Sequence, residues 1–293
     1  MRYKFAEIIK KIAKKDKRVV FMTGDLGFHA FESLRDSIGE RFINAGVAEH
    51  NMITAAAGMA YAGLKPWVYS IAPFVTIKVL EEVRNDICLP NFNVKIVGLG
   101  GGYDYGIAGP THHALNDVAI MMTLPNMKVY TPGFAEDLEQ IVGKMYAEKG
   151  PAYLRLTKAE KMPVKISKYA QVRRIVKGDK ATVVVLGSII NRLLPAEGLD
   201  VWLVSEIPFT LSRELTESIK KTKNVVVVEE HGEMGGLGHY FHHMLFANKV
   251  PVKKFLHLHA KGYMSHKSGS RDFYLKENKL DAKSVTQTIR SLI

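Results

Sequence analysis

Cysteine is almost absent from this sequence. A single one, Cys88, occurs among the 293 residues. One thiol cannot form a disulfide within the chain, and cysteine-rich metal sites need several cysteines close together. The composition therefore excludes both a disulfide-stapled scaffold and a cysteine-ligated metal module.

Long apolar runs are lacking as well. No stretch reaches the roughly 18 apolar residues that a membrane-spanning helix requires. Residues 2–16 alternate apolar and charged positions at helical spacing, so they lack the apolar centre of a secretion signal. These absences predict a soluble, cytoplasmic protein that makes no contact with a membrane.

Motifs for nucleotides and metals are also missing. The glycine-rich stretches 98–106 and 232–239 have neither the GxGxxG spacing of a dinucleotide fold nor the pattern of a Walker loop. His239 and His243 stand four residues apart, which could place two nitrogens on one helical face. Because they lack an HExxH frame and a third ligand, the sequence predicts no metal site in this chain.

The charge is unbalanced toward the basic side. The chain has 41 lysines and arginines against 29 acidic residues, a net charge of +12. The basic residues are spread along the chain and no nucleic-acid motif accompanies them, so we expect no nucleic-acid partner. A basic surface would instead attract anionic substrates such as sugar phosphates. Part of the excess lies in 158–180, which we interpret as a solvated linker.

Apolar strands alternate with helices along the chain. This alternation is typical of α/β domains, in which helices cover both faces of a parallel sheet. The expected strands are 18–25, 41–47, 64–72, 93–102, 127–132, 151–157, 180–188, 201–209 and 224–232. Besides a helix that stops at Gly63, the expected helices are 2–16, 75–89, 115–125, 136–150 and 235–248.

The same pattern divides into two units. We predict two domains, each a mostly parallel sheet flanked by helices. The first domain spans 1–165, a linker spans 166–178, and the second domain spans 179–293. The chain is long enough for both domains to bury a core.

A single glutamate, Glu49, stands at the entrance of a helix of small residues in "NAGVAEHNMITAAAGMAYAG", 44–63. A glutamate in a first helical turn interacts favourably with the helix dipole and needs no function for that. The small residues that follow would let another backbone or a flat ligand approach closely. The residues alone leave a structural and a ligand-binding interpretation equally open.

Two histidines end the turn "GPTHH", 109–113. Glycine and proline fix the backbone just before His112 and His113, in a loop that follows a strand. Open parallel sheets place ligand-binding groups in such loops. A plain surface turn is the alternative interpretation.

Four motifs together resemble a known family. "TGDLG", "NAGVAEHNMITAAAGMAYAG", "YSIAPFV" and "GPTHH" occur in the order and spacing of the thiamine diphosphate-dependent transketolases. The resemblance covers the pyrimidine-binding domain and the C-terminal domain of that family, and so nearly the whole chain. The chain is also similar, less closely, to 1-deoxyxylulose 5-phosphate synthases and to the beta subunits of pyruvate dehydrogenases.

The resemblance implies roles for individual residues. Glu49 matches the glutamate that hydrogen-bonds the aminopyrimidine ring of thiamine diphosphate and helps the cofactor lose its thiazolium proton. Phe74 matches an aromatic residue that stacks on that ring, and Asp25 and Leu26 match a pair near the cofactor. His112 matches a histidine that faces the substrate oxygens. We therefore expect Glu49 and His112 to be catalytic.

Substrate contacts are implied for three further residues. His113 would help to hold the carbonyl end of the substrate. Arg155, with Lys158 as a second candidate, lies near the position of a phosphate-binding arginine in the family. Ala108 departs from the pattern, because the family usually carries an acid there that contacts a sugar hydroxyl.

The magnesium motif of the family is missing. Full-length members begin with a domain that holds the diphosphate through Mg²⁺, with a "GDG" followed some 25 to 30 residues later by asparagine, as the resemblance implies. This chain has no "GDG". The resemblance therefore implies a partner subunit that carries this domain and most of the Mg²⁺ site, and a heterotetramer with two copies of each chain.

The sequence thus predicts the C-terminal subunit of a split transketolase. It would transfer a two-carbon ketol unit between phosphorylated sugars and would be active only with its partner. One alternative is a subunit of a decarboxylating ketol synthase that uses pyruvate as donor. A non-catalytic regulatory subunit is the other.

Overall fold

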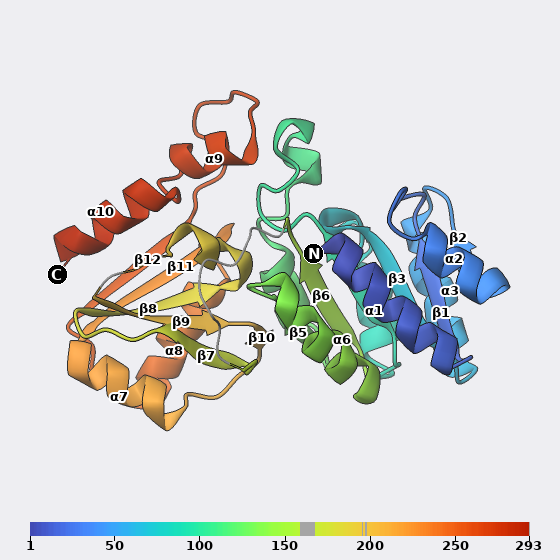
Figure 1. The fold of residues 1–293 in the computed structure, drawn as a ribbon, viewed down its shortest axis with the longest axis horizontal. Helices are drawn as coiled ribbons and strands as arrows, with labels where there is room; N and C mark the ends of the chain where they lie inside the picture. The colour runs from blue at the N-terminus through green and yellow to red at the C-terminus, as the bar shows by residue number, and fades with distance from the viewer. Residues whose placement is uncertain (159–167, 195, 197, 293) are drawn as a thin grey trace.

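The computed structural model describes residues 1–158, 168–194, 196 and 198–292. Figure 1 shows two sheets side by side, each with helices packed against it. The predicted class, α/β with two mostly parallel sheets, is confirmed. The N-terminus lies near the junction of the two units, and the C-terminus lies at the far end of the second unit (Figure 1).

The described residues form a first sheet of seven strands. These are β1 (Val19–Thr23), β2 (Phe42–Asn44), β3 (Lys65–Ile71), β4 (Lys95–Leu99), β5 (Lys128–Tyr130), β6 (Ala152–Leu156) and β10 (Glu206–Ile207). Their order is β10-β5-β6-β4-β3-β1-β2, and only β10 runs antiparallel to its neighbour. The carboxyl ends of the parallel strands therefore meet at one edge, where loops can gather ligand-binding residues.

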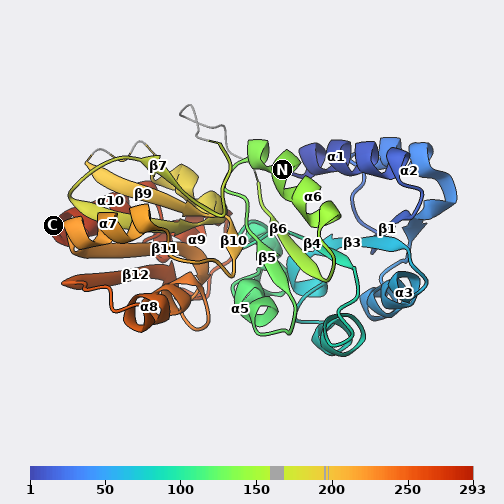
Figure 2. The same cartoon turned by 90° about the horizontal axis from the view of Figure 1, so that it is seen from below.

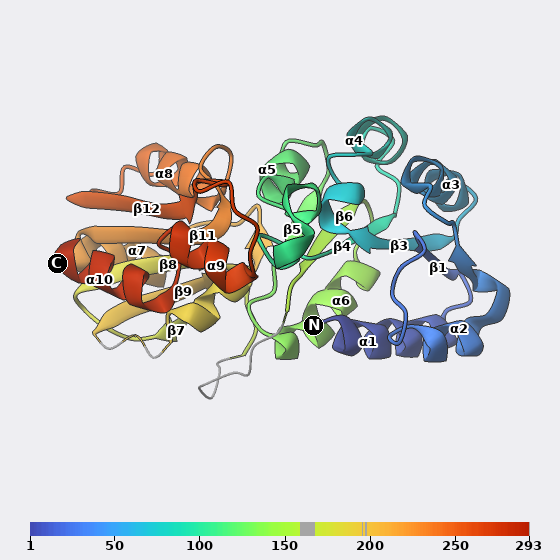
Figure 3. The same cartoon turned by 90° about the horizontal axis from the view of Figure 1, so that it is seen from above.

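Helices cover both faces of this sheet, as Figures 2 and 3 show. One face carries α1 (Arg2–Lys15), α2 (Glu32–Ile38) and α6 (Leu138–Ala147). The other carries α3 (Glu49–Tyr61), α4 (Leu80–Glu82) and α5 (Asp117–Met122). Because both faces are covered, β1 is buried along its whole length and its sequence, VVFMT, is almost entirely apolar.

The second sheet has a similar plan. Its described strands are β7 (Val172–Val176), β8 (Ala181–Leu186), β9 (Leu199–Val204), β11 (Asn224–Gly232) and β12 (Lys254–Ala260), in the order β12-β11-β8-β9-β7. All are parallel except β7. The buried side chains of α7 (Arg213–Thr222) and α8 (Leu237–Ala247) share one apolar cluster, and those of α9 (Arg271–Glu277) and α10 (Ala282–Leu292) share another.

The division into domains differs from the prediction in two places. The expected linker 166–178 contains β7, which pairs with β9 and so belongs to the second sheet. The expected strand 201–209 is broken, because β10 leaves β9 and pairs with β5 of the first sheet. The expected boundary at 165 lies outside the described residues.

The predicted helix 75–89 is wrong in its first five residues and, after α4, in its type. Residues 75–79 form turns, α4 is a single helical turn, and Val83–Cys88 is a π-helix. The buried residues Val79, Val83 and Ile87 still face the core. The chain directly after β3 forms the short 3-10 turn that carries Phe74. π-Turns like Val83–Cys88 are frequent near functional sites.

Several elements had no prediction at all. These are α2, α7, β12, α9 and α10. None of the helices in the described ranges has the length and apolar character that crossing a bilayer would require.

Candidate active site

Glu49 is a buried carboxylate at the start of α3. Its exposed fraction is only 2%. Ser70 on β3 donates its hydroxyl to Glu49 Oε1 at 3.3 Å, and the ammonium of Lys78 lies 2.6 Å from Oε2. An interaction with the helix dipole alone would not require this burial. The chain instead places hydrogen-bonding groups around a carboxylate that water hardly reaches.

A glycine lies directly beside this carboxylate. Gly24 follows β1, and a Cβ added to it would lie 3.3 Å from Glu49 Oε1 and 3.4 Å from Ser70 Oγ. The buried residues Ala56 and Ala57 continue α3 with minimal side chains that pack in the core. A larger residue at position 24 would therefore crowd the carboxylate.

Asp25 and Leu26 follow Gly24 in the loop after β1. Asp25 adopts a φ of +56°, and it exchanges two hydrogen bonds of 3.0 Å with the side chain of Asn44 on β2. The carbonyl of Leu26 accepts the Thr23 hydroxyl at 2.8 Å. These bonds fix the loop in an unusual backbone conformation, which is common where a loop serves a binding site.

Phe74 and His112 meet at the same edge of the sheet. Phe74 ends a short 3-10 turn after β3, and His112 ends another after Pro110. Their ring centroids are 5.3 Å apart, with the planes 64° from each other. The ammonium of Lys78 lies 5.6 Å from the centre of the Phe74 ring. The structure thus connects Glu49, Phe74 and His112 through Lys78 and one ring contact.

A separate pocket of about 560 Å³ lies at the ends of β4 and β6. Two cationic side chains, Arg2 and Lys158, line it together with Tyr105 and the buried Asp104. The Tyr105 ring lies 5.8 Å from that of His112. This pocket offers positive charge to an anion near the loop that carries His112.

Comparisons with known proteins identify the family. Residues 1–162 match the model described as transketolase, pyrimidine binding domain. The chain belongs to the transketolase family. It is 30% identical to a putative transketolase C-terminal section of Methanocaldococcus jannaschii, over 99% of this chain and 95% of that protein. Over 86% of this chain and 85% of the relative, it is 29% identical to one subunit of an apulose-4-phosphate transketolase from Actinobacillus succinogenes.

A solved structure of the same family supports the fold. It is described as a split gene transketolase, inactive beta4 tetramer. The TM-score is 0.85 at 28% identity, and the match covers 99% of this chain and 97% of that one. Membership of the transketolase family implies dependence on thiamine diphosphate.

The residues around Glu49 fit the pyrimidine half of that cofactor. A buried carboxyl group beside Gly24 and the half-buried ring of Phe74 are connected through Lys78, which suits a flat ring with hydrogen-bonding nitrogens. Among the described residues, no three histidine, cysteine, aspartate or glutamate side chains are grouped so that they could hold a metal ion.

His113 is buried, and other residues of the chain hold its ring. It is 5% exposed, and its Nε2 lies 2.8 Å from the carbonyl of Gly106, while its Nδ1 lies 3.0 Å from the Tyr263 hydroxyl. Burial lowers its pKa, so the neutral ring is favoured. Both ring nitrogens are therefore used to hold the loop, and the expected role of His113 in substrate binding is not supported by its position.

Arg155 is likewise turned into the protein. It is 5% exposed, its Nε donates to Asp117 Oδ2 at 2.9 Å, and its Nη2 donates to the carbonyls of Ala114 and Glu230. This position gives no support to the predicted role of Arg155 in binding the substrate phosphate. Its sequence position on β6 resembled the family pattern, but alternate residues of a buried strand face opposite sides of the sheet.

Sequence reasoning missed Arg2 and Lys78. Arg2 begins α1, far in sequence from Lys158, and no motif links the two. Lys78 stands four residues after Phe74, in a segment that was expected to be a helix. An exposed face of that helix would have pointed the lysine to solvent, whereas the observed turn brings it to Glu49.

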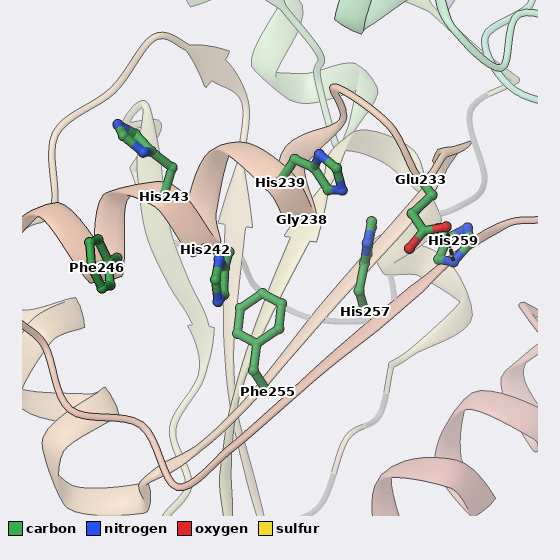
Figure 4. Close-up of a pocket in the computed structure, with 9 residues that line it drawn as sticks. All are labelled: Glu233, Gly238, His239, His242, His243, Phe246, Phe255, His257 and His259. Atoms are coloured by element: carbon green, nitrogen blue, oxygen red, sulfur yellow. Dashed lines mark ion pairs between the residues drawn. The ribbon is translucent and has the colours of Figure 1, made fainter.

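A groove rich in histidine lies on the second domain, between α8 and β12 (Figure 4). His239, His242 and His243 come from the helix, and His257 and His259 come from the strand. His257 Nε2 lies 2.6 Å from the buried carboxylate of Glu229. In Figure 4, His243 points away from His257, so the pair His239 and His243 is not directed at one point.

Proposed function

We propose that this chain is the pyrimidine-binding subunit of a split transketolase. It would transfer a two-carbon ketol unit between phosphorylated sugars, together with a partner subunit. The observation that carries the proposal is the buried carboxylate of Glu49, which Lys78 connects to the ring of Phe74. Two relatives are named as one subunit of a transketolase and as a transketolase C-terminal section, which supports a chain that works with a partner.

The chain's own residues would act around the cofactor. When bound, thiamine diphosphate would supply the carbanion chemistry, which amino-acid side chains lack. Glu49 would share a proton with a ring nitrogen of the pyrimidine, and Phe74 would hold the ring by stacking. His112, whose ring lies against Phe74, would donate a hydrogen bond to a substrate oxygen. The loop with Asp25 and Leu26 would close one side of the ring site.

The partner would bring the diphosphate half of the site. We propose that it carries the "GDG" and asparagine motif and most of the Mg²⁺ site, in a heterotetramer with two copies of each chain. The absence of a "GDG" sequence here supports this assignment. Glu49 and Phe74 would then face the partner across the cofactor.

Phosphorylated substrates suit the pocket beside this site. Lys158 and Arg2 would bind the substrate phosphate, since both line the pocket. A lysine and an arginine together offer several donors to a phosphate group. The sugar-phosphate name of one relative, an apulose-4-phosphate transketolase, is in accord with this substrate class.

Replacement of Glu49 by glutamine tests the proposed chemistry. Glutamine keeps the size but cannot share a proton as a carboxyl group does, so turnover of the reconstituted pair should fall by about 100-fold or more. The matched control is Glu217→Gln, which removes an exposed carboxylate paired with Arg213. Thermal midpoints of both variants should stay close to that of the natural chain. Near-normal turnover of Glu49→Gln with saturating cofactor would reject the proposal.

A further inference from the structure

The glycine-rich loop after β4 is packed tightly against the second domain. Its Tyr103 N–H donates to Oε1 of Glu230, a buried residue of β11, at 2.8 Å. Gly102 has a φ of +67°, and a Cβ added there would lie 2.5 Å from the Glu230 carboxyl carbon. The loop therefore approaches this carboxylate as closely as a backbone can.

One guanidinium lies between the two domains at this place. Arg271, the first residue of α9, is 8% exposed. Its Nη2 donates to Glu230 Oε2 at 2.6 Å, and its Nη1 lies 3.5 Å from Oδ1 of Asp104 in the loop. The two carboxylates, one from each domain, thus share a positive charge away from water. A buried pair that loses its cation is strongly destabilised.

The same loop leads on to the proposed substrate-binding residues. Asp104 Oδ2 accepts the N–H of Lys158 at 2.7 Å. A Cβ added to Gly106, further along the loop, would lie 3.0 Å from the backbone nitrogen of Arg271. Four residues beyond Ala108 the chain reaches His112. Arg271 therefore lies against the backbone of the loop that leads to His112. Through Asp104 it is also connected to the backbone of Lys158.

We propose that Arg271 is a positioning residue for the substrate site. By holding Asp104 and Glu230 together, it fixes the loop of residues 100–113 and with it His112 and Lys158. The second domain would thus contribute to catalysis without touching the substrate. This inference rests on the proposed function, and it adds a role for α9 that the cofactor chemistry does not require.

The electrostatics explain why the loop depends on this arginine. Burial raises the pKa of Asp104, whereas the charge of Arg271 lowers it. Without the guanidinium, Asp104 and Glu230 would be two buried acids with no shared cation. They would repel each other, and the loop would move. A shift of about 1 Å in a positioning group can change a rate by about 100-fold.

The positioning role is tested with two variants of Arg271 and one control. The variants are Arg271→Gln and Arg271→Lys, and the control is Arg192→Gln. Arg192 ends the 3-10 turn after β8 and pairs with Asp272 of α9 at 2.8 Å, so the control removes a guanidinium paired with α9 while Arg271 keeps its contacts with the loop. In the reconstituted enzyme, Arg271→Gln should raise the KM for the phosphorylated sugar about tenfold or more. The cofactor concentration for half activity should change less than about twofold, because Glu49 and Phe74 lie on other elements. Arg271→Lys, which keeps the charge, should recover part of the loss. A KM within twofold of the natural enzyme, or an equal rise in cofactor demand, would overturn the inference.

Hydrogen exchange of the full chain gives a readout that needs no activity. In Arg271→Gln, or in Arg271→Lys should the first variant fail to fold, the amides of 100–113 should exchange faster while those of β1 keep their protection. Unchanged exchange in 100–113 would overturn the positioning role. Absence of ketol transfer by the natural pair, with the exchange result as expected, would reject the proposed function but keep the contact between Arg271 and the loop.

Discussion

The ammonium of Lys78 lies 2.6 Å from Oε2 of Glu49, the carboxylate proposed to meet the cofactor ring. It also lies 5.6 Å from the centre of the Phe74 ring. The lysine side chain is 40% exposed, while that of Glu49 is 2% exposed. In the chain by itself, the Lys78 ammonium is thus paired with the carboxylate that a pyrimidine ring would need as its hydrogen-bond partner.

Lys78→Met should therefore make the cofactor easier to bind. The ring would no longer compete with the ammonium for Glu49. Pairs with an exposed partner contribute about 0.2–1 kcal/mol, so the thiamine diphosphate concentration for half activity should fall by up to about fivefold. Titration of the reconstituted enzyme measures this, with Lys4→Met as control for an exposed pair. A higher cofactor demand would mean that Lys78 itself helps to hold the cofactor.

Ala108→Asp should sharpen the choice of acceptor sugar. Ala108 is exposed at the end of a 3-10 turn, so an aspartate can be accommodated without burial. Asp104 cannot replace it, because its carboxylate faces Arg271 and the N–H of Lys158. A charged hydrogen bond to a sugar hydroxyl is worth about 1.5–3 kcal/mol, so discrimination should rise about tenfold or more. The measurement is a panel of aldose phosphates of both configurations at the second carbon.

Two results would contradict that prediction. The natural enzyme could already select one configuration as strongly as the aspartate variant, which would mean that another group reads the hydroxyl. Alternatively, Ala108→Asn could give the same gain as Ala108→Asp. In that case the added side-chain volume, and not the charge, would be the cause.

Lys95 should make the stability of the chain depend on pH. Its ammonium is buried at the amino end of β4, where Nζ donates to the carbonyls of Gly150 and Glu148 at 2.7 and 3.1 Å. Burial lowers its pKa to about 7, whereas an unfolded lysine titrates near 10.4. Between these values the unfolded chain binds one proton more than the folded chain. Stability should therefore rise with pH in this window, by at most about 1.4 kcal/mol per unit.

Urea unfolding at pH 7.5, 8.5 and 9.5 checks this sign. Other groups titrate in the same range, so the comparison is the difference between the natural chain and Lys95→Met. That difference should move in favour of the natural chain as the pH rises. A difference that is constant over the three pH values would show that Lys95 stays charged in the folded protein.

The sequence was most informative about residues that stand in separate motifs but were expected at one site. Glu49, Phe74 and His112 stand in separate segments, and the structure places them at one edge of the first sheet. Parallel strands with a common carboxyl edge make that meeting predictable from strand order alone. Arg155 and His113 show the limit, since burial depends on side-chain direction and on partners such as Asp117 that lie far away in sequence.

The alternation of apolar strands and helices predicted the two-sheet fold, but it did not predict how the sheets are joined. β10 has only two residues, and its pairing with β5 depends on tertiary contact rather than on a local pattern. β7 lies in a basic stretch and has a partly exposed face. Its charged residues interrupt the apolar pattern from which the other strands were predicted, so it was interpreted as part of a linker. Edge strands often carry charged residues.

Ketol transfer by the purified chain, alone and mixed with a "GDG"-bearing partner subunit, tests most directly whether catalysis needs both. With thiamine diphosphate, Mg²⁺ and a ketose phosphate donor, we expect no turnover by the chain alone and turnover after mixing. The same mixture containing Glu49→Gln should remain about 100-fold or more slower. Robust transfer by the chain alone, or turnover of the mixture only with pyruvate as donor, would contradict a split transketolase.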